Sequence, residues 1–230
     1  MAVVCRERRL LYLLNPRTGG SAIAKQLIDH FGGEGLPKDH ILAADGSILL
    51  QQKHQTLAQL LRFGVVTAEE AGQYIAFTNV CNPFDSLVSL YVKYRDRYAR
   101  IRDEGEFWIT HSGPTVLGEI DYCRSHPFNE WVARTYWKPV VLTLVRRRRF
   151  SINEGYPDGC RAVLRKEFLQ DDFTRFLRDF GIPGDPVLPV HNRTEAKASG
   201  ASYRDYYSPL SRALVAITYR DDLARWGYRF

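Results

Sequence analysis

Two segments of the chain have the residue types and spacing that bind an anion at the start of a helix. In residues 11–23, an apolar run ends in a proline and two glycines before a helical pattern begins. In residues 77–91, a second apolar run passes through Asn82 and Pro83 into another helical pattern. The free N–H groups and the dipole of a helix N-terminus favour negative charge. Two such segments in one chain predict a ligand with phosphates at both ends.

The two segments also resemble the nucleotide motifs of one enzyme family. Residues 16–21 read Pro-Arg-Thr-Gly-Gly-Ser, and residues 82–91 read Asn-Pro-Phe-Asp-Ser-Leu-Val-Ser-Leu-Tyr. Sulfotransferases that use 3′-phosphoadenosine-5′-phosphosulfate (PAPS), above all the carbohydrate-type, Golgi-like group, have a Pro-Lys/Arg-Thr/Ser-x-Gly-Thr/Ser loop. Their later motif is Arg-Asn/Asp-Pro-Tyr/Phe-x-Arg-Leu-Val-Ser-x-Tyr. The order, spacing and strand-to-helix context of the two segments are similar to those of this family.

Further stretches extend the resemblance over most of the chain. Lys53-His54-Gln55-Thr56 is similar to a Lys-His-x-Thr helix start that many relatives have between the two motifs. Residues 162–173 resemble the family's late strand and its Glu-Asn-Leu-x-x-Asp-Phe continuation. Residues 188–193, 203–207, 219–222 and 227–230 are similar to its C-terminal segment. The resemblance is weakest over about 97–160, which we expect to form the divergent acceptor-binding part.

The resemblance implies a role for each chemical group. Arg17 and the loop amides would hold the 5′-phosphosulfate, because charge builds on the bridging oxygen as the bond to sulfur breaks. His54 would be the general base, since an imidazole with a reference pKa of about 6.5 can take the acceptor's proton near neutral pH. His40 and Glu70 are alternative bases, and a helix-capping or packing role is the alternative for His54. The implied nucleotide-binding residues are Pro16, Arg17, Thr18, Gly19, Gly20, Ser21, Ala22, Cys81, Ser89, Arg193 and Arg204.

The second motif departs from the family at its two arginines. Ser89 matches the serine that binds the 3′-phosphate, but the family arginine eight residues earlier is Cys81, and the second arginine is Ser86. Loss of the first arginine removes a charge-assisted contact that is typically worth about 1.5–3 kcal/mol. Either the nucleotide binds more weakly, or another cation supplies the charge, for which Arg193, Lys197 and Arg204 are the sequence's candidates. A different donor or a loss of activity is the remaining alternative.

The elements that must position these groups alternate between strands and helices. Apolar runs predict strands at 10–14, 74–80, 140–145 and 162–165. Helical patterns cover 21–31, 56–63, 85–98, 127–136, 170–180 and 210–224. This order favours one α/β domain over residues 1–230, with a central parallel sheet flanked by helices, and the resemblance implies a layout similar to that of P-loop NTPases. Ligands of such a sheet bind beyond the carboxyl ends of its strands.

Composition fits these expectations without deciding between them. The net charge of +6 suggests anionic ligands. Cys5, Cys81, Cys123 and Cys160 lack a CxxC or other metal-ligand spacing, so we expect thiols in a reducing compartment and no metal. The apolar run at 10–14 is too short for a signal or membrane segment, in contrast to the anchored Golgi relatives. We therefore expect a soluble, cytoplasmic enzyme of bacterial type.

We expect PAPS as co-substrate, its product 3′-phosphoadenosine-5′-phosphate (PAP) as a ligand, and a small-molecule, glycan or tyrosine hydroxyl as acceptor. One alternative is a nucleotide kinase on the same layout, which should carry a Walker lysine that this chain lacks. Another is a non-catalytic module that binds polyanions through the arginines at 146–149, which would emerge at a sheet edge after the strand at 140–145. Four arginines at such a place more often form a solvated surface, so nucleic acid is disfavoured as a partner.

Overall fold

A computed structural model describes residues 1–110, 113–184, 186–189 and 202–230 of the chain. These residues form two compact units. The first comprises Met1–Cys81 and Asn153–Asn192, and the second Asn82–Ile152 and Arg193–Phe230, apart from the gaps just given. We describe each unit separately.

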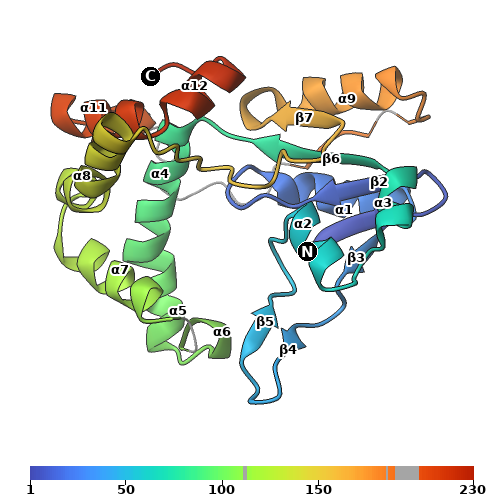
Figure 1. Cartoon of the computed structure of the whole chain (residues 1–230), viewed down its shortest axis with the longest axis horizontal. Coiled ribbons are helices and arrows are strands. Elements are labelled where there is room, and N and C mark those ends of the chain that lie inside the picture. Colours follow the sequence, from blue (N-terminus) through green and yellow to red (C-terminus); the bar gives the residue numbers. More distant parts are fainter. Residues whose placement is uncertain (111–112, 185, 190–201) are drawn as a thin grey trace. The chain divides into compact units, whose positions relative to one another are not determined.

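The first unit contains a five-stranded sheet (Figure 1). Its strands are β1 (Ala2–Cys5), β2 (Leu10–Leu13), β3 (Glu34–Leu36), β6 (Ile75–Val80) and β7 (Ala162–Arg165), in the order β3-β1-β2-β6-β7. Strand β6 pairs in parallel with both β2 and β7, whereas β1 is antiparallel to both β2 and β3. The predicted central sheet is thus mixed and mostly parallel, and the expectation of a purely parallel sheet is wrong at β1. A short turn over residues 6–9 joins β1 to β2, and only an antiparallel pair can be joined so briefly.

Alternate side chains of the strands enter two apolar cores, one on each face of the sheet. Val3, Leu10, Tyr12 and Phe77 pack with helices α1 (Gly20–His30) and α9 (Leu169–Asp179). Ala2, Val4, Leu11, Leu13 and Ala76 pack on the other face, with α2 (Leu57–Arg62) and α3 (Ala68–Gln73). Because both faces are covered, β2 and β6 read as nearly continuous apolar runs, which is why the sequence pattern identified them.

Local capping residues define the start of α2 and α3. Thr56 and Thr67 each accept a hydrogen bond from the backbone three residues later, and the side chains of Gln59 and Glu70 reach back to the cap. Such a capping box satisfies two helix-end donors at once. The remaining described elements of this unit are a hairpin of β4 (Ile41–Leu42) and β5 (Ile48–Leu50), and the 3₁₀ segment η2 (Lys166–Phe168).

The second unit is helical over its described residues. Its elements are α4 (Pro83–Val92), the π-helical η1 (Lys93–Tyr98), α5 (Ala99–Asp103), α6 (Phe107–Thr110), α7 (Pro114–Ser125), α8 (Phe128–Arg146), the 3₁₀ segment η3 (Tyr203–Tyr206), α11 (Pro209–Thr218) and α12 (Arg220–Trp226). Helices α4, α8 and α11 share an aromatic-rich core that includes Phe84, Tyr91, Phe128, Trp131 and Tyr219. Edge-to-face contacts such as Tyr91 on Phe128, at a centroid distance of 5.4 Å, stabilise this core.

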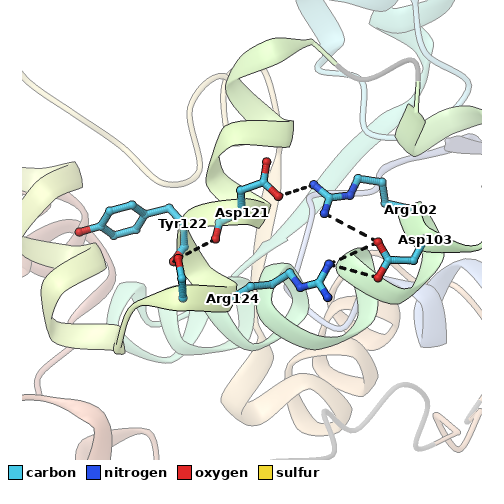
Figure 2. Close-up of polar contacts among 6 residues, drawn as sticks. Arg102, Asp103, Asp121, Tyr122 and Arg124 are labelled. Atoms are coloured by element: carbon cyan, nitrogen blue, oxygen red, sulfur yellow. Dashed lines mark hydrogen bonds and ion pairs between the residues drawn. The ribbon is translucent and has the colours of Figure 1, made fainter.

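Charged residues join α5 to α7 in the second unit (Figure 2). Arg102 donates to Asp121 at 2.6 Å and lies 3.8 Å from Asp103, and Arg124 reaches Asp103 at 3.1 Å. Single exposed ion pairs contribute little, but linked charges orient one another's side chains. These linked ion pairs therefore connect α5 to α7 at the surface, and they contribute little to the stability of the fold.

Two predicted elements differ from the structure in the second unit. The strand predicted at 140–145 is wrong, because these residues form the last turns of α8. Only Val140 and Thr143 of this run are buried, and their spacing of three continues a buried helical face. The arginines at 146–149 consequently end a helix and do not lie at a sheet edge. The helix predicted at 210–224 is two helices, α11 and α12, separated at Tyr219. Among the described helices, none is long and apolar enough to cross a membrane.

Candidate functional site

The loop at residues 16–21 connects β2 to α1 in an unusual backbone conformation. Arg17 has a φ of 66° and Gly19 a φ of 78°, both in the left-handed region. A non-glycine residue in this region costs about 1–3 kcal/mol, and such strained residues cluster at functional sites. Gly19 is the N-cap of α1 and has no side chain to occupy the helix's free N–H groups. The loop therefore ends in backbone donors that suit an anion.

Buried polar side chains hold this loop in place. Asn79, on the neighbouring strand β6, donates from its side-chain amide to the backbone carbonyl of Thr18 at 2.7 Å. The Thr18 hydroxyl donates to the Asn15 carbonyl at 2.7 Å. Asn15 in turn donates to the Asn79 carbonyl and to the Asn153 side chain, each at 2.9 Å. All four residues are buried, so the loop is rigidly attached to the sheet.

Residue 20 must be glycine for a steric reason. A Cβ at this position would collide with the hydroxyl of Tyr12, which also donates a hydrogen bond to the Asn79 side chain. The close approach of α1 to β2 therefore requires glycine at residue 20, while Gly19 is required by its positive φ. Both glycines of the predicted loop have a structural role in shaping it.

His54 lies against the beginning of the same loop. Its ring Nδ1 is 3.1 Å from the backbone carbonyl oxygen of Leu14, the residue at the end of β2. A carbonyl oxygen only accepts, so Nδ1 carries the hydrogen and donates it. In the neutral ring, Nε2 then has the free lone pair, which is the tautomer that a general base needs. The helix-capping alternative for His54 is excluded, because Thr56 is the cap of α2.

The backbone of His54 is also constrained. Its φ of 68° lies in the left-handed region, and the Tyr156 hydroxyl donates to its carbonyl oxygen at 2.6 Å. Two separate hydrogen bonds, one to the ring and one to the main chain, thus hold a strained residue in position. Strain that the surrounding structure maintains in this way is a feature of functional sites.

The environment of His54 keeps its ring neutral at pH 7. Partial burial lowers the pKa of His54 from 6.5 to about 4; the hydrogen bond to Leu14 opposes this, and the positive charges of the Met1 amine, Arg17 and Lys53 add to the lowering. One side of the residue remains exposed. The chemical consequence is that the ring can accept a proton at neutral pH, although it is a weaker base than a free imidazole.

A cavity of about 440 Å³ opens beside His54. Its lining includes Ser21 at the end of the loop, Lys53 and His54, and from α1 Lys25 and Asp29. Lys25 and Asp29 form an ion pair at 2.6 Å. The cavity is large enough for a small acceptor or one ring of a larger one. Ser21 at the end of the loop, the neutral ring of His54 and the ammonium group of Lys53 therefore line the same cavity.

Lys166 approaches Cys81, the position at which the family that the sequence resembles has an arginine. Its Nζ lies 3.7 Å from the sulfur of Cys81, which is buried at the end of β6. Its side chain also passes within 3.7 Å of where a Cβ on Gly19 would lie. Lys166 directly follows β7, the strand next to β6, so the parallel pairing brings it to the same end of the sheet. The sequence interpretation missed this cation and considered only C-terminal ones.

Two further predicted site residues belong to the second unit. Ser89 is buried on α4, in the helix that the sequence pattern predicted. The Arg204 guanidinium donates to the carbonyl of Phe230 at 3.0 Å. Arg193 and Lys197 lie outside the described residues. The assignment of these four to the nucleotide stays a prediction from the sequence.

The alternative bases have structural roles. The backbone N–H of Gln52 donates to Nδ1 of His40 at 3.0 Å, which holds the β4–β5 hairpin. Glu70 completes the capping box of α3, where its carboxylate accepts from the Thr67 backbone at 2.9 Å. That backbone hydrogen bond is the main cause that lowers the pKa of Glu70. Neither residue lines the cavity beside His54.

Three further residues that hold the site were not predicted: Asn79, Asn153 and Tyr156. Asn79 gave one visible signal, a buried amide within an otherwise apolar strand. Asn153 and Tyr156 lie in the stretch that was expected to be divergent and acceptor-binding, and they hold the loop through Asn15 and the backbone of His54. No local pattern points to them, because their partners are more than a hundred residues away.

Comparisons with models of protein families, with curated proteins and with solved structures find no match to this chain.

Proposed function

We propose that this chain is a sulfotransferase that transfers the sulfuryl group of PAPS to a hydroxyl group of an acceptor. Carbohydrates, natural products and peptide tyrosines are the acceptor classes that this chemistry allows. The observation that carries the proposal is the hydrogen bond between the His54 ring and the Leu14 carbonyl. It joins two segments that the sequence resemblance singled out separately, forty residues apart in the chain.

The candidate site residues of the first unit then have roles in an in-line displacement. The amides at the start of α1 and the guanidinium of Arg17 bind the 5′-phosphosulfate. Nε2 of His54 removes the proton of the acceptor hydroxyl as its oxygen attacks sulfur. The bond between sulfur and the bridging oxygen breaks, and the negative charge that remains on the 5′-phosphate is stabilised by Arg17. The products are the sulfated acceptor and PAP, and the proton on His54 passes to solvent.

Lys166 supplies the positive charge that the family takes from an arginine at the position of Cys81. Its ammonium nitrogen lies 3.7 Å from the sulfur of that thiol. The sequence resemblance assigns the 3′-phosphate to Ser89.

Calorimetric titration with PAP tests the nucleotide part of the proposal without knowledge of the acceptor. We expect a dissociation constant in roughly the micromolar range or tighter. AMP, which lacks the 3′-phosphate, should bind at least about tenfold more weakly. The variant Ser89→Ala should lose most of this discrimination. Equal binding of PAP and AMP by the unmodified chain would contradict the 3′-phosphate assignment.

Transfer of ³⁵S from labelled PAPS to a panel of hydroxyl acceptors tests the chemical part. The panel contains mono- and disaccharides, tyrosine peptides and phenols, with the Arg17→Ala variant as the negative control. Binding of PAP without transfer to any acceptor, and without hydrolysis of PAPS, would leave a nucleotide-binding protein that is not a sulfotransferase.

A further inference from the structure

The outward face of α8 carries an apolar stripe. Trp137, Val141, Leu144 and Val145 are between 41% and 74% exposed. Their spacing of four, three and one places them on one side of the helix. The adjoining side of the helix, with residues such as Tyr136 and Val140, packs into the core of the second unit. The last turns of α8 therefore have a broad apolar surface, of which one part is buried in the core and the adjoining part is exposed.

Cations surround this stripe. Lys138 is exposed next to Trp137, and the four arginines at 146–149 are all exposed at the end of the helix. Positive charge in the last turn suits the helix dipole, which accounts for Arg146 but not for three more arginines beyond the helix end. Arg149 forms an ion pair with Asp221 at 3.4 Å, and Arg148 lies over the Phe150 ring at 5.3 Å. We call these residues, Trp137, Lys138, Val141, Leu144, Val145 and 146–149, the α8 patch.

We propose that the α8 patch binds the surface of an anionic lipid bilayer. An amphipathic helix with aromatic and aliphatic side chains on its outer face lies in the plane of the interface and inserts them among the headgroups. Clustered arginines and lysines are attracted by the negative lipids of the same surface. Tryptophan is the side chain most typical of this depth, because its ring is apolar and its N–H remains hydrated. Such binding is peripheral and requires no membrane-crossing helix.

Other partners fit the α8 patch less well. In a two-fold dimer the patch would face itself, and the arginine runs of both copies would repel each other. Nucleic acid would satisfy the arginines, but Val141, Leu144 and Val145 would gain nothing from a phosphate backbone. An anionic bilayer is the partner that uses both the apolar stripe and the charges.

Flotation of the full chain with vesicles tests the proposal. We expect binding to vesicles of phosphatidylcholine with about 30 mole per cent phosphatidylserine, and little to phosphatidylcholine alone. Salt should weaken the binding, because it screens the attraction between the cations and the anionic headgroups. At physiological ionic strength, each arginine or lysine near the surface strengthens the binding by about fivefold. The fluorescence of the chain should shift to the blue on binding, and Trp137→Phe should remove that shift while binding persists.

Variants separate the apolar from the charged contribution. Leu144→Ser/Val145→Ser should weaken vesicle binding by at least about tenfold, since two aliphatic side chains no longer insert. Arg146→Gln/Arg147→Gln should weaken it by about 25-fold. The matched controls are Leu42→Ser/Leu49→Ser on the β4–β5 hairpin and Arg178→Gln on α9, where exposed residues of the same types lie outside the α8 patch. Because every substituted side chain is exposed, the variants should keep their fold, which circular dichroism checks.

Three outcomes would overturn the proposal. The first is a lack of binding to anionic vesicles. The second is that Leu144→Ser/Val145→Ser leaves the affinity for vesicles unchanged and that the chain binds a DNA duplex with the same affinity. The α8 patch would then be a general polyanion-binding surface. The third is a dimer, detected by light scattering, that Leu144→Ser/Val145→Ser dissociates, because the stripe would then be covered by a second copy.

Discussion

The side chain of Asn79 donates a hydrogen bond to the backbone carbonyl of Thr18 at 2.7 Å, from one parallel strand to the loop that follows the next. Asn79 is fully buried, and it also accepts from the Tyr12 hydroxyl. One amide thus links the inside of the sheet to the shape of the loop. The position of the loop amides that we propose to bind an anion depends on a residue that would not itself contact the anion.

Asn79→Ala should therefore affect both stability and nucleotide binding. Loss of the amide leaves buried groups of Tyr12 and Thr18 without this partner, which should lower the free energy of unfolding by about 1–3 kcal/mol. The loop should also become less ordered, so PAP should bind more weakly. Thr78→Val is the matched control: it removes the buried hydrogen bond to the Leu13 carbonyl, at 2.7 Å, on the adjacent residue. Denaturation and calorimetry should show similar destabilisation for both variants but a loss of PAP affinity for Asn79→Ala alone.

Much of the sheet could be predicted because its strands are buried on both faces. Strands β2, β6 and β7 were found as short apolar runs, and the loop after β2 was found from its glycines. The run at 140–145 has the same composition, and its β-branched residues favoured a strand. Its spacing of buried residues continues that of the preceding turns of α8, and tertiary packing in the second unit decides the conformation. Composition alone cannot separate a short buried strand from the end of a buried helix.

The candidate site could be predicted only in part, because some of its residues are defined by contacts that are distant in the sequence. The residues named from the sequence, such as Arg17 and His54, are those whose chemistry is visible in a local motif. The residues that hold them, Asn153 and Tyr156, act through single hydrogen bonds to partners more than a hundred residues away. Lys166 could be found only once the pairing of β6 with β7 was known.

Arg17 should be essential for transfer. Arg17→Ala should lower sulfuryl transfer by about 10²-fold or more, as loss of a donor to developing charge commonly does. Arg17→Lys keeps a cation and should keep much of the activity. Arg9→Ala is the matched control, because Arg9 is also an arginine with a positive φ, at 53°, in the turn between β1 and β2. Near-normal turnover of Arg17→Ala would mean that the loop has only a structural role.

Lys166 should contribute to the affinity for the nucleotide. We expect Lys166→Gln to weaken PAP binding by about tenfold, the usual range for a lost charge-assisted hydrogen bond. AMP should be affected less if the ammonium faces the 3′-phosphate, and equally if it faces the 5′ side next to Gly19. Calorimetry with both nucleotides distinguishes the two cases. Arg178→Gln, on the surface of α9, is the control. Unchanged PAP affinity in Lys166→Gln would show that Lys166 does not bind the nucleotide, and Arg193, Lys197 and Arg204 would remain as the candidate cations.

Asp172 should make the stability of the first unit depend on acidic pH. Burial of its carboxylate alone would raise the pKa, but hydrogen bonds and charges from Arg165 and Arg175 lower the pKa of Asp172 below its usual value of 3.8. The Arg165 backbone N–H donates to this carboxylate at 2.9 Å and its Nε at 3.1 Å. A lowered carboxyl pKa contributes stability above the unfolded value, and this contribution is lost as pH falls through the folded value.

Asp172→Asn should therefore destabilise the chain by about 1.5–3 kcal/mol at pH 7. The difference from the unmodified chain should begin to shrink as the pH falls below the unfolded pKa of about 3.8, and it should be lost once the pH falls through the lower folded pKa, where the native carboxylate is also protonated. Urea denaturation at a series of pH values measures this difference. Asp29→Asn, whose carboxylate forms an exposed pair with Lys25, is the control and should change stability little. A difference that stays constant between pH 7 and pH 3 would mean that the ion pair with Arg165 contributes nothing.

His54 should act as the base, and its substitution should separate chemistry from binding. His54→Asn suits the left-handed backbone, and its side-chain amide can still donate towards Leu14, but it cannot take a proton. We expect kcat to fall by roughly 10²–10⁴-fold. PAP affinity should change little, because the ring faces the cavity beside Ser21. His40→Asn and Glu70→Gln are the matched controls, and a normal kcat in His54→Asn would transfer the role to one of them.

The pH dependence of turnover gives a second, independent check on His54. The neutral ring is the active form, so kcat/KM should fall as pH drops through the folded pKa of His54, which lies well below 6.5. Lys53→Met removes a positive charge that lowers this pKa and should move the acid limb to higher pH. Bound PAPS brings negative charge near the ring, which should raise the pKa of His54. The acid limb of kcat should therefore lie at a higher pH than the acid limb of kcat/KM. A limb that stays in place in both Lys53→Met and His54→Asn would show that another group titrates, and that His54 is not the base.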